Sequence, residues 1–143
     1  ALVRAQANAE LNGFASDVCK WRQADVFEYL RSAREAGDTY DLIILDPPKF
    51  ASSHYHVDRA ARAYKDINLN GLRLLRAGGR LLTFSCSGAI DTDLFQKIVA
   101  GAVIDARRDA WAIERFGAGA DHPLMMTFPE GEYLKGLHLK LCD

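Results

Sequence analysis

The stretch that decides the fold is an apolar run ending in an acid and two prolines: Tyr40-Asp41-Leu42-Ile43-Ile44-Leu45-Asp46-Pro47-Pro48-Lys49-Phe50. Such a run, bounded by turn residues, indicates a buried central strand of a parallel sheet. Each proline fixes φ and removes a backbone donor, so the strand stops after Asp46. In open α/β sheets ligands bind outside the carboxyl ends of the strands. Asp46 is therefore predicted either to line a site for a planar, hydrogen-bonding group such as a nucleobase, or to be a solvated turn residue.

The composition is that of one ordinary globular domain. The chain has 143 residues, of which 49% are apolar and 26% are charged, and its formal net charge is −1. That length is enough to bury a core, and no apolar run approaches the roughly 18 residues of a membrane span. The three cysteines are widely spaced and form no metal-binding motif, which favours a reduced, cytoplasmic setting without a metal. The near-neutral charge gives no broad footprint for nucleic acid.

Periodicity and turn residues predict the remaining elements. We expect helices over 1–11, 26–36, 58–77 and 92–106, strands over 18–24, 40–46, 80–86, 110–117 and 136–142, and a loop over 47–57. Asp25 with Glu28 is typical of a helix cap, Gly37 of a helix end, and Gly78-Gly79 is expected to close the long helix. This order predicts an α/β, Rossmann-like doubly wound sheet, mostly parallel with an antiparallel C-terminal strand.

Five motifs in order give a family resemblance. They are Asp46-Pro47-Pro48-Lys49-Phe50, Tyr64-Lys65-Asp66-Ile67-Asn68, Thr83-Phe84-Ser85-Cys86-Ser87-Gly88, Ala120-Asp121-His122-Pro123 and Pro129-Glu130-Gly131-Glu132-Tyr133-Leu134-Lys135-Gly136. Together they resemble the class I S-adenosylmethionine-dependent methyltransferases, and most closely the large-subunit ribosomal RNA cytosine-5 methyltransferase I (RlmI-like) family. The resemblance runs across nearly the whole chain and implies S-adenosyl-L-methionine as cofactor and ribosomal RNA as partner.

The resemblance also implies what the chain lacks. Residues 1–143 would be the C-terminal portion of the catalytic domain, N-terminally truncated, because no G-x-G-x-x-G turn occurs and residues 1–11 begin a helix without a cap. The first two strands, the Gly-rich cofactor loop and an N-terminal RNA-binding domain would then be missing. Such a fragment is expected to be inactive, to bind the cofactor poorly and to associate, as a homodimer or otherwise, through exposed sheet edges.

Cys86 is the candidate nucleophile. It follows the strand 80–86 between two serines, and a thiolate there can add to C6 of a cytosine and make C5 nucleophilic. From the residues alone an inert buried cysteine is the commoner alternative. Asp46 would lie beside Cys86 if the two strands are neighbours, and would then help to protonate the cytosine N3. Cys19 and Cys142 lie in strand-like apolar runs and are predicted to be core residues.

The resemblance assigns the other site residues. The cofactor would contact Asp25, the Val26 amide and Asp46, although Asp25 is equally explained as a helix cap. The residues assigned to the substrate are Pro47, Pro48, Lys49, Phe50, Ser85 and His122.

Two other functions stay open. The better-known cytosine-5 RNA methyltransferases carry a second cysteine after the proline of the fourth-strand motif, where this chain has Lys49, so the base that removes the C5 proton is not assigned. A guanine-N2 methyltransferase of the same fold also has Asp-Pro-Pro but needs no Cys86. A truncated binding domain would transfer no methyl group at all.

Overall fold

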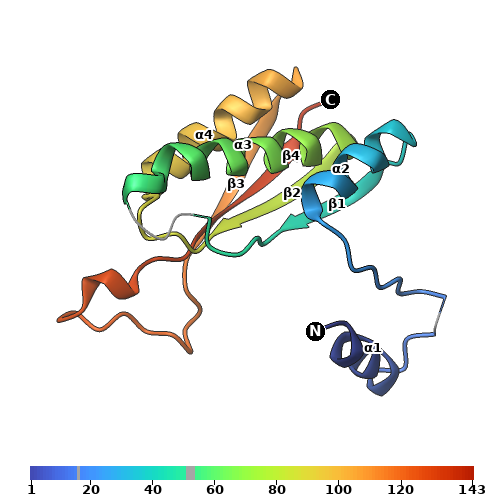
Figure 1. Cartoon of the computed structure of the whole chain (residues 1–143), viewed down its shortest axis with the longest axis horizontal. Helices are drawn as coiled ribbons and strands as arrows, with labels where there is room; N and C mark the ends of the chain where they lie inside the picture. Colours follow the sequence, from blue (N-terminus) through green and yellow to red (C-terminus); the bar gives the residue numbers. More distant parts are fainter. Residues whose placement is uncertain (16, 51–53) are drawn as a thin grey trace.

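The computed structural model describes residues 1–15, 17–50 and 54–143, without the side chain of His54 (Figure 1). Its elements in chain order are α1 (Leu2–Leu11), α2 (Val26–Glu35), β1 (Tyr40–Leu45), η1 (His54–His56), α3 (Val57–Leu74), β2 (Leu75–Ser85), α4 (Thr92–Ala106), β3 (Ala110–Phe116), η2 (Pro129–Gly131) and β4 (Lys135–Leu141). None of the helices in the described part is long and apolar enough to cross a membrane.

The four-stranded sheet has the order β1-β2-β4-β3. Strands β1 and β2 pair in parallel, while β4 is antiparallel to both of its neighbours, so β1, β2 and β3 run in one direction. The predicted sheet, mostly parallel with an antiparallel C-terminal strand, is confirmed, as is the adjacency of the strands that carry Asp46 and Cys86. The carboxyl ends of β1 and β2 and the start of β4 therefore meet at one edge.

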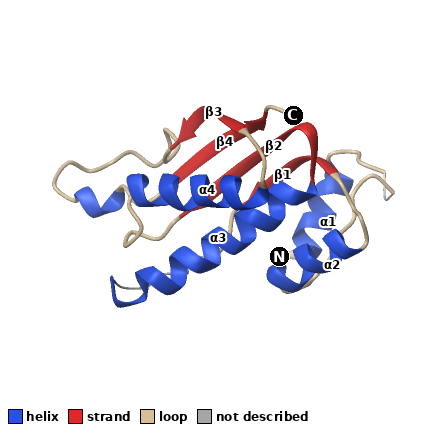
Figure 2. Ribbon diagram, turned by 90° about the horizontal axis from the view of Figure 1, so that it is seen from above, coloured by secondary structure: helices blue, strands red, loops and turns tan. Residues whose placement is uncertain are grey.

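The core lies between the sheet and three helices. Helices α2, α3 and α4 cover one face of the sheet (Figures 1 and 2), and Leu45, Leu81 and Leu139 are buried beneath them. One face of α3 is buried, at Ala60, Tyr64, Ile67, Gly71 and Leu74, with Leu75 just beyond. Leu42 and Ile44 point to the opposite face of β1 and are 49% and 59% exposed. The prediction of a buried central strand is wrong for the described sheet, because β1 lies at its edge and pairs only with β2.

The predicted caps form. The Asp25 carboxylate accepts hydrogen bonds from the backbone N–H groups of Phe27 and Glu28, at 2.9 and 3.1 Å. Asp91 does the same for α4 through the N–H of Leu94 at 2.7 Å. Gly37 follows α2 with φ +76°, a conformation that residues with a Cβ rarely adopt. These local signals set where α2 and α4 begin and where α2 ends.

Residues 18–24 do not form the predicted strand. They are irregular, and α1 lies apart from the sheet (Figure 1). A strand needs a partner for its backbone N–H and C=O groups, and within the described sheet β1 pairs only with β2. The prediction of two core cysteines is also wrong, because Cys19 is only half-buried and Cys142 is exposed.

The long helix ends three residues earlier than predicted. Leu75 is already extended and pairs with Tyr40, so β2 begins there and Gly78 with Gly79 lie within it. The Arg108 guanidinium donates to the carbonyls of Leu72 and Leu75, which supplies partners at the end of α3. The predicted loop 47–57 contains the short turn η1, and its residues 51–53 lie outside the described residues.

Candidate functional site

Asp46 and Cys86 lie at the carboxyl ends of adjacent parallel strands. Leu45, the last residue of β1, pairs with Thr83, so Cys86 lies two residues beyond the level of Asp46. Two residues of strand correspond to roughly 7 Å along the strand direction. Asp46 is exposed and Cys86 is half-buried. An acid and a thiol at this offset can face different atoms of one six-membered ring.

The turn that carries Cys86 is held by buried hydroxyl groups. Ser85 and Ser87, on either side of the cysteine, are both 0% exposed. The Ser87 N–H donates to the Ser85 hydroxyl at 3.3 Å, and the Ser87 hydroxyl lies 3.0 Å from that of Tyr64. The two serines therefore shape the turn around Cys86. A contact of Ser85 with the substrate stays a prediction.

Tyr64 links this turn to the loop after β1. Its ring packs against Phe50 with 4.8 Å between centroids and meets Phe95 edge-on at 5.7 Å. Phe50 in turn lies 5.9 Å from Phe27 at the start of α2. Phe50 thus anchors the Asp46-Pro47-Pro48 loop onto the helices, and its contact with the substrate stays a prediction. One buried tyrosine contacts the loops of both candidate residues.

Lys135, the first residue of β4, is buried beside the same turn. It pairs with Ser85 across the β2–β4 ladder and is 7% exposed. Its Nζ donates to the carbonyl oxygens of Ser87, at 2.7 Å, and of Ile90. Burial lowers the pKa of Lys135, and the negative charges of a Cys86 thiolate and of Asp91 oppose that shift. The Nζ atom of Lys135 therefore lies against the buried side of the Cys86 turn.

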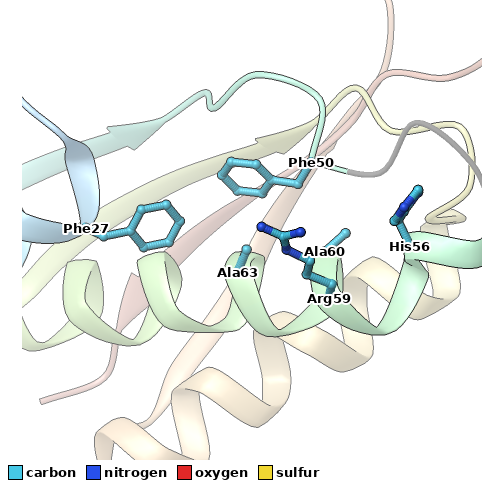
Figure 3. Close-up of a pocket in the computed structure, with 6 residues that line it drawn as sticks. All are labelled: Phe27, Phe50, His56, Arg59, Ala60 and Ala63. Atoms are coloured by element: carbon cyan, nitrogen blue, oxygen red, sulfur yellow. The ribbon is translucent and has the colours of Figure 1, made fainter.

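A hollow of about 530 Å³ opens on the helix side of Phe50. Figure 3 shows the Phe27 and Phe50 rings along one side of it and Arg59 rising from α3. The other residues that line it are His56, Ala60 and Ala63. It combines aromatic surface with the guanidinium of Arg59 close to the motif that follows β1.

The start of α2 presents polar groups that match an adenine ring. Both capping bonds of Asp25 end on Oδ1, and Oδ2 has no hydrogen-bond partner within the described residues. Neither bond uses the N–H of Val26, which as the first helical residue has no intrahelical acceptor. An acceptor and a donor on consecutive residues fit the amino group and a ring nitrogen of adenine. The cap and the predicted cofactor contact are therefore compatible.

The remaining predicted residues are spread along the same edge. Pro47 is half-buried, while Pro48 and Lys49 are exposed. His122 lies in the excursion between β3 and β4, where its Nδ1 is 3.2 Å from the Asp121 carboxylate. It lines a second hollow of about 320 Å³ together with Tyr133 and Leu134. In the described part of the chain, no three His, Cys, Asp or Glu side chains are grouped to hold a metal ion.

Sequence comparison supplies the family. No family model matches the chain. It is, however, 53% identical over 137 residues to ribosomal RNA large subunit methyltransferase I of Shewanella amazonensis. It is 52% identical over 136 residues to the protein of the same name from Photobacterium profundum. These matches cover 96% and 95% of this chain. The chain is a member of this family over the segment that it spans. That segment corresponds to about a third of the relatives' length, 35% and 34% respectively.

Solved structures agree on the methyltransferase fold. One neighbour is a putative methyltransferase crystallised in complex with SAH, with a TM-score of 0.79 and 23% identity. Another is a putative SAM-dependent methyltransferase from Streptococcus mutans, with a TM-score of 0.78 and 22% identity. Each superposition covers 94% of this chain and about a third of the neighbour, 35% and 34%. The class I methyltransferase fold inferred from the motifs is confirmed.

Two residues at this edge were not assigned a role from the sequence. Tyr64 and Lys135 both lie within motifs that carry the family resemblance, but their partner Ser87 is 23 and 48 residues away. The sequence did contain one signal for Lys135, because this lysine stands at the start of a strand whose alternating leucines are buried. A lysine that is buried with them requires a nearby hydrogen-bond acceptor.

Proposed function

We propose that the protein carrying this sequence transfers a methyl group from S-adenosyl-L-methionine to C5 of a cytosine in ribosomal RNA. The observation that carries the proposal is the placement of Cys86 and Asp46 at the carboxyl ends of adjacent parallel strands. It is supported by relatives that are named ribosomal RNA large subunit methyltransferase I. The RNA substrate and the cytosine chemistry both belong to the proposal.

The proposed steps use the two residues in turn. The Cys86 thiolate forms a bond from Sγ to C6 of the cytosine, while Asp46 assists protonation at N3. Electron density released to C5 lets that carbon take the methyl group of S-adenosylmethionine, with S-adenosylhomocysteine as the leaving group. A base then removes the proton from C5, the Cys86–C6 bond breaks and returns the thiolate, and N3 gives its proton back to Asp46, which restores the aromatic ring. In this scheme Asp25 and the Val26 amide hold the adenine of the cofactor, with Asp46 also adjacent to it.

The Cys86 environment favours nucleophilic over structural use of the thiol. A buried structural cysteine packs among apolar side chains, whereas Cys86 is half-buried between two hydrogen-bonded serines. A partly exposed thiol beside polar and cationic groups is the setting in which cysteines react. A guanine-N2 methyltransferase would need no thiol at this position.

The test is to trap the covalent intermediate. The intact protein that carries this sequence is incubated with S-adenosylmethionine and RNA containing 5-fluorocytosine, whose C5 substituent cannot leave as a proton. We expect a denaturant-stable protein–RNA adduct that Cys86→Ala abolishes and that Cys19→Ala retains. An equal amount of adduct with Cys86→Ala would contradict the role of Cys86. Methylation of a guanine without any adduct would favour the guanine-N2 alternative, and no transfer at all would favour a binding domain.

A further inference from the structure

Lys135 is the one buried cation among the strongly buried residues of the described chain. Charged side chains are rarely buried unless they are paired or fully hydrogen-bonded, because desolvation of an ammonium group is costly. Lys135 pairs with no carboxylate within hydrogen-bond reach in the described structure, and its two acceptors there are main-chain carbonyls. The cation is thus used to hold backbone, and the backbone in question is the segment that follows Cys86.

The two acceptors fix the shape of that segment. Ser87 O and Ile90 O bracket the turn between β2 and α4, and the Ile90 N–H donates back to Ser87 O at 3.1 Å. Ser87 O therefore accepts from both Lys135 and Ile90. Lys135 reaches this turn from β4, on the other side of β2 from β1. A single side chain from a distant part of the sequence closes the turn next to the thiol.

We propose that Lys135 is a positioning residue for Cys86, holding the 86–90 turn by its two carbonyl contacts and placing a cation behind the thiol. This inference rests on the proposed function, because it assumes that Cys86 is the nucleophile. The charge of Lys135 would support the same reaction as its hydrogen bonds, because a cation near a thiol favours the thiolate form. The role differs from plain stabilisation in what it affects: loss of two buried hydrogen bonds lowers the stability of the fold, whereas loss of a positioning residue also lowers the adduct rate of a variant that still folds.

The experiment compares substitutions at two lysines of the same strand in the intact protein. Lys135→Met keeps the length of the side chain but removes its charge and its hydrogen-bond donors. Lys135→Arg keeps the charge and the donors. Lys140→Met is the matched control, since Lys140 is exposed on β4 and pairs with Arg80, at the opposite end of the β2–β4 ladder from Ser85. The measurements are kcat, KM for S-adenosylmethionine and for RNA, and the rate of adduct formation with 5-fluorocytosine RNA.

We expect Lys135→Met to lower kcat and the adduct rate by about 10²-fold, the loss that a displacement of about 1 Å causes at a reacting group. Both KM values should stay within about twofold, Lys135→Arg should recover part of the rate, and Lys140→Met should resemble the wild type. Adduct formation by Lys135→Met at the wild-type rate would overturn the inference. So would a loss that appears only in KM.

Two further observations separate the possible failures. If the wild-type protein forms no Cys86 adduct, the proposed function fails, whatever the lysine variants do. If Lys135→Met does not fold, as judged by its circular dichroism and thermal midpoint, Lys135→Gln decides the matter by the same adduct rate. The glutamine retains a donor for one carbonyl and lacks the charge. A wild-type adduct rate in a folded Lys135→Gln protein would overturn the inference.

Discussion

Replacing Tyr64 by phenylalanine removes one atom from the contact that joins the two loops of the site. The Tyr64 hydroxyl lies 3.0 Å from the Ser87 hydroxyl, and both residues are 0% exposed. Phenylalanine retains the ring, so the packing against Phe50 and Phe95 is preserved and no cavity is created. The change therefore isolates the hydrogen bond that connects α3 to the Cys86 turn.

The expected cost is that of one buried hydrogen bond, about 1 kcal/mol. For a chain of 143 residues this corresponds to a fall of about 3 °C in the thermal midpoint. Urea unfolding followed by circular dichroism should show a lower midpoint concentration with an unchanged slope, because the surface exposed on unfolding is the same. Turnover of the intact protein should fall by about tenfold, since the turn next to Cys86 loses one of its fixed points.

A second tyrosine provides the control. The Tyr29 and Tyr40 hydroxyls also lie 3.0 Å apart, but that pair is only part-buried and lies away from the Cys86 turn. Tyr29→Phe should cost less than about 0.5 kcal/mol and leave turnover unchanged. Equal losses of stability and turnover in the two variants would refute the reasoning, because the effect would then come from removing any tyrosine hydroxyl.

Two other predictions follow from exposure and from charge. Asp46→Asn should change the free energy of unfolding by less than about 0.5 kcal/mol, because the residue is exposed. It should nevertheless lower kcat by about 10²-fold. Unchanged turnover would mean that Asp46 is only a turn residue. The hydrogen bond from Tyr29, with burial, raises the pKa of Tyr40 from 10.0 to about 12. The contribution of this hydrogen bond to the stability of the fold is therefore complete below pH 10 and is lost as the pH rises from 10 to 12. Ultraviolet titration should find one such tyrosine, and Tyr29→Phe should move its midpoint back toward 10; an unmoved midpoint would exclude Tyr29 as the cause.

Local chemistry accounts for the parts of the fold that the sequence predicted correctly. Asp25 and Asp91 cap helices because each carboxylate reaches N–H groups two or three residues ahead. The alternating leucines of β4 give a buried face because side chains in a strand point to opposite sides. The acid and the prolines after β1 end the strand through the backbone of the prolines themselves. All of these signals lie within a few residues of the effect.

The errors come from partners that a local pattern does not contain. Residues 18–24 have a strand-like pattern but no ladder partner among the described strands. The end of α3 is set by Leu75 pairing with Tyr40 and by Arg108, which are 35 and 33 residues from Leu75. The placement of Asp46 and Cys86 at one edge of the sheet was predictable because both follow strands. Tyr64 and Lys135 were not, because their role is to contact a turn far away in the chain.

At this edge the buried side chains hold the backbone in place, and the accessible side chain of Cys86 is left for the proposed chemistry. A nucleophile must be reached by its substrate, so it cannot be fixed by being enclosed; its position has to come from the backbone on which it stands. Ser85 and Ser87 are fully buried around a half-buried Cys86, and their contacts come from the turn itself and from α3, with Lys135 adding its contact from β4. Since those contacts are made to backbone and hydroxyl groups, the thiol of Cys86 is left to react. Its reactivity is therefore expected to respond to substitutions at Tyr64 and Lys135 that leave the thiol itself unchanged.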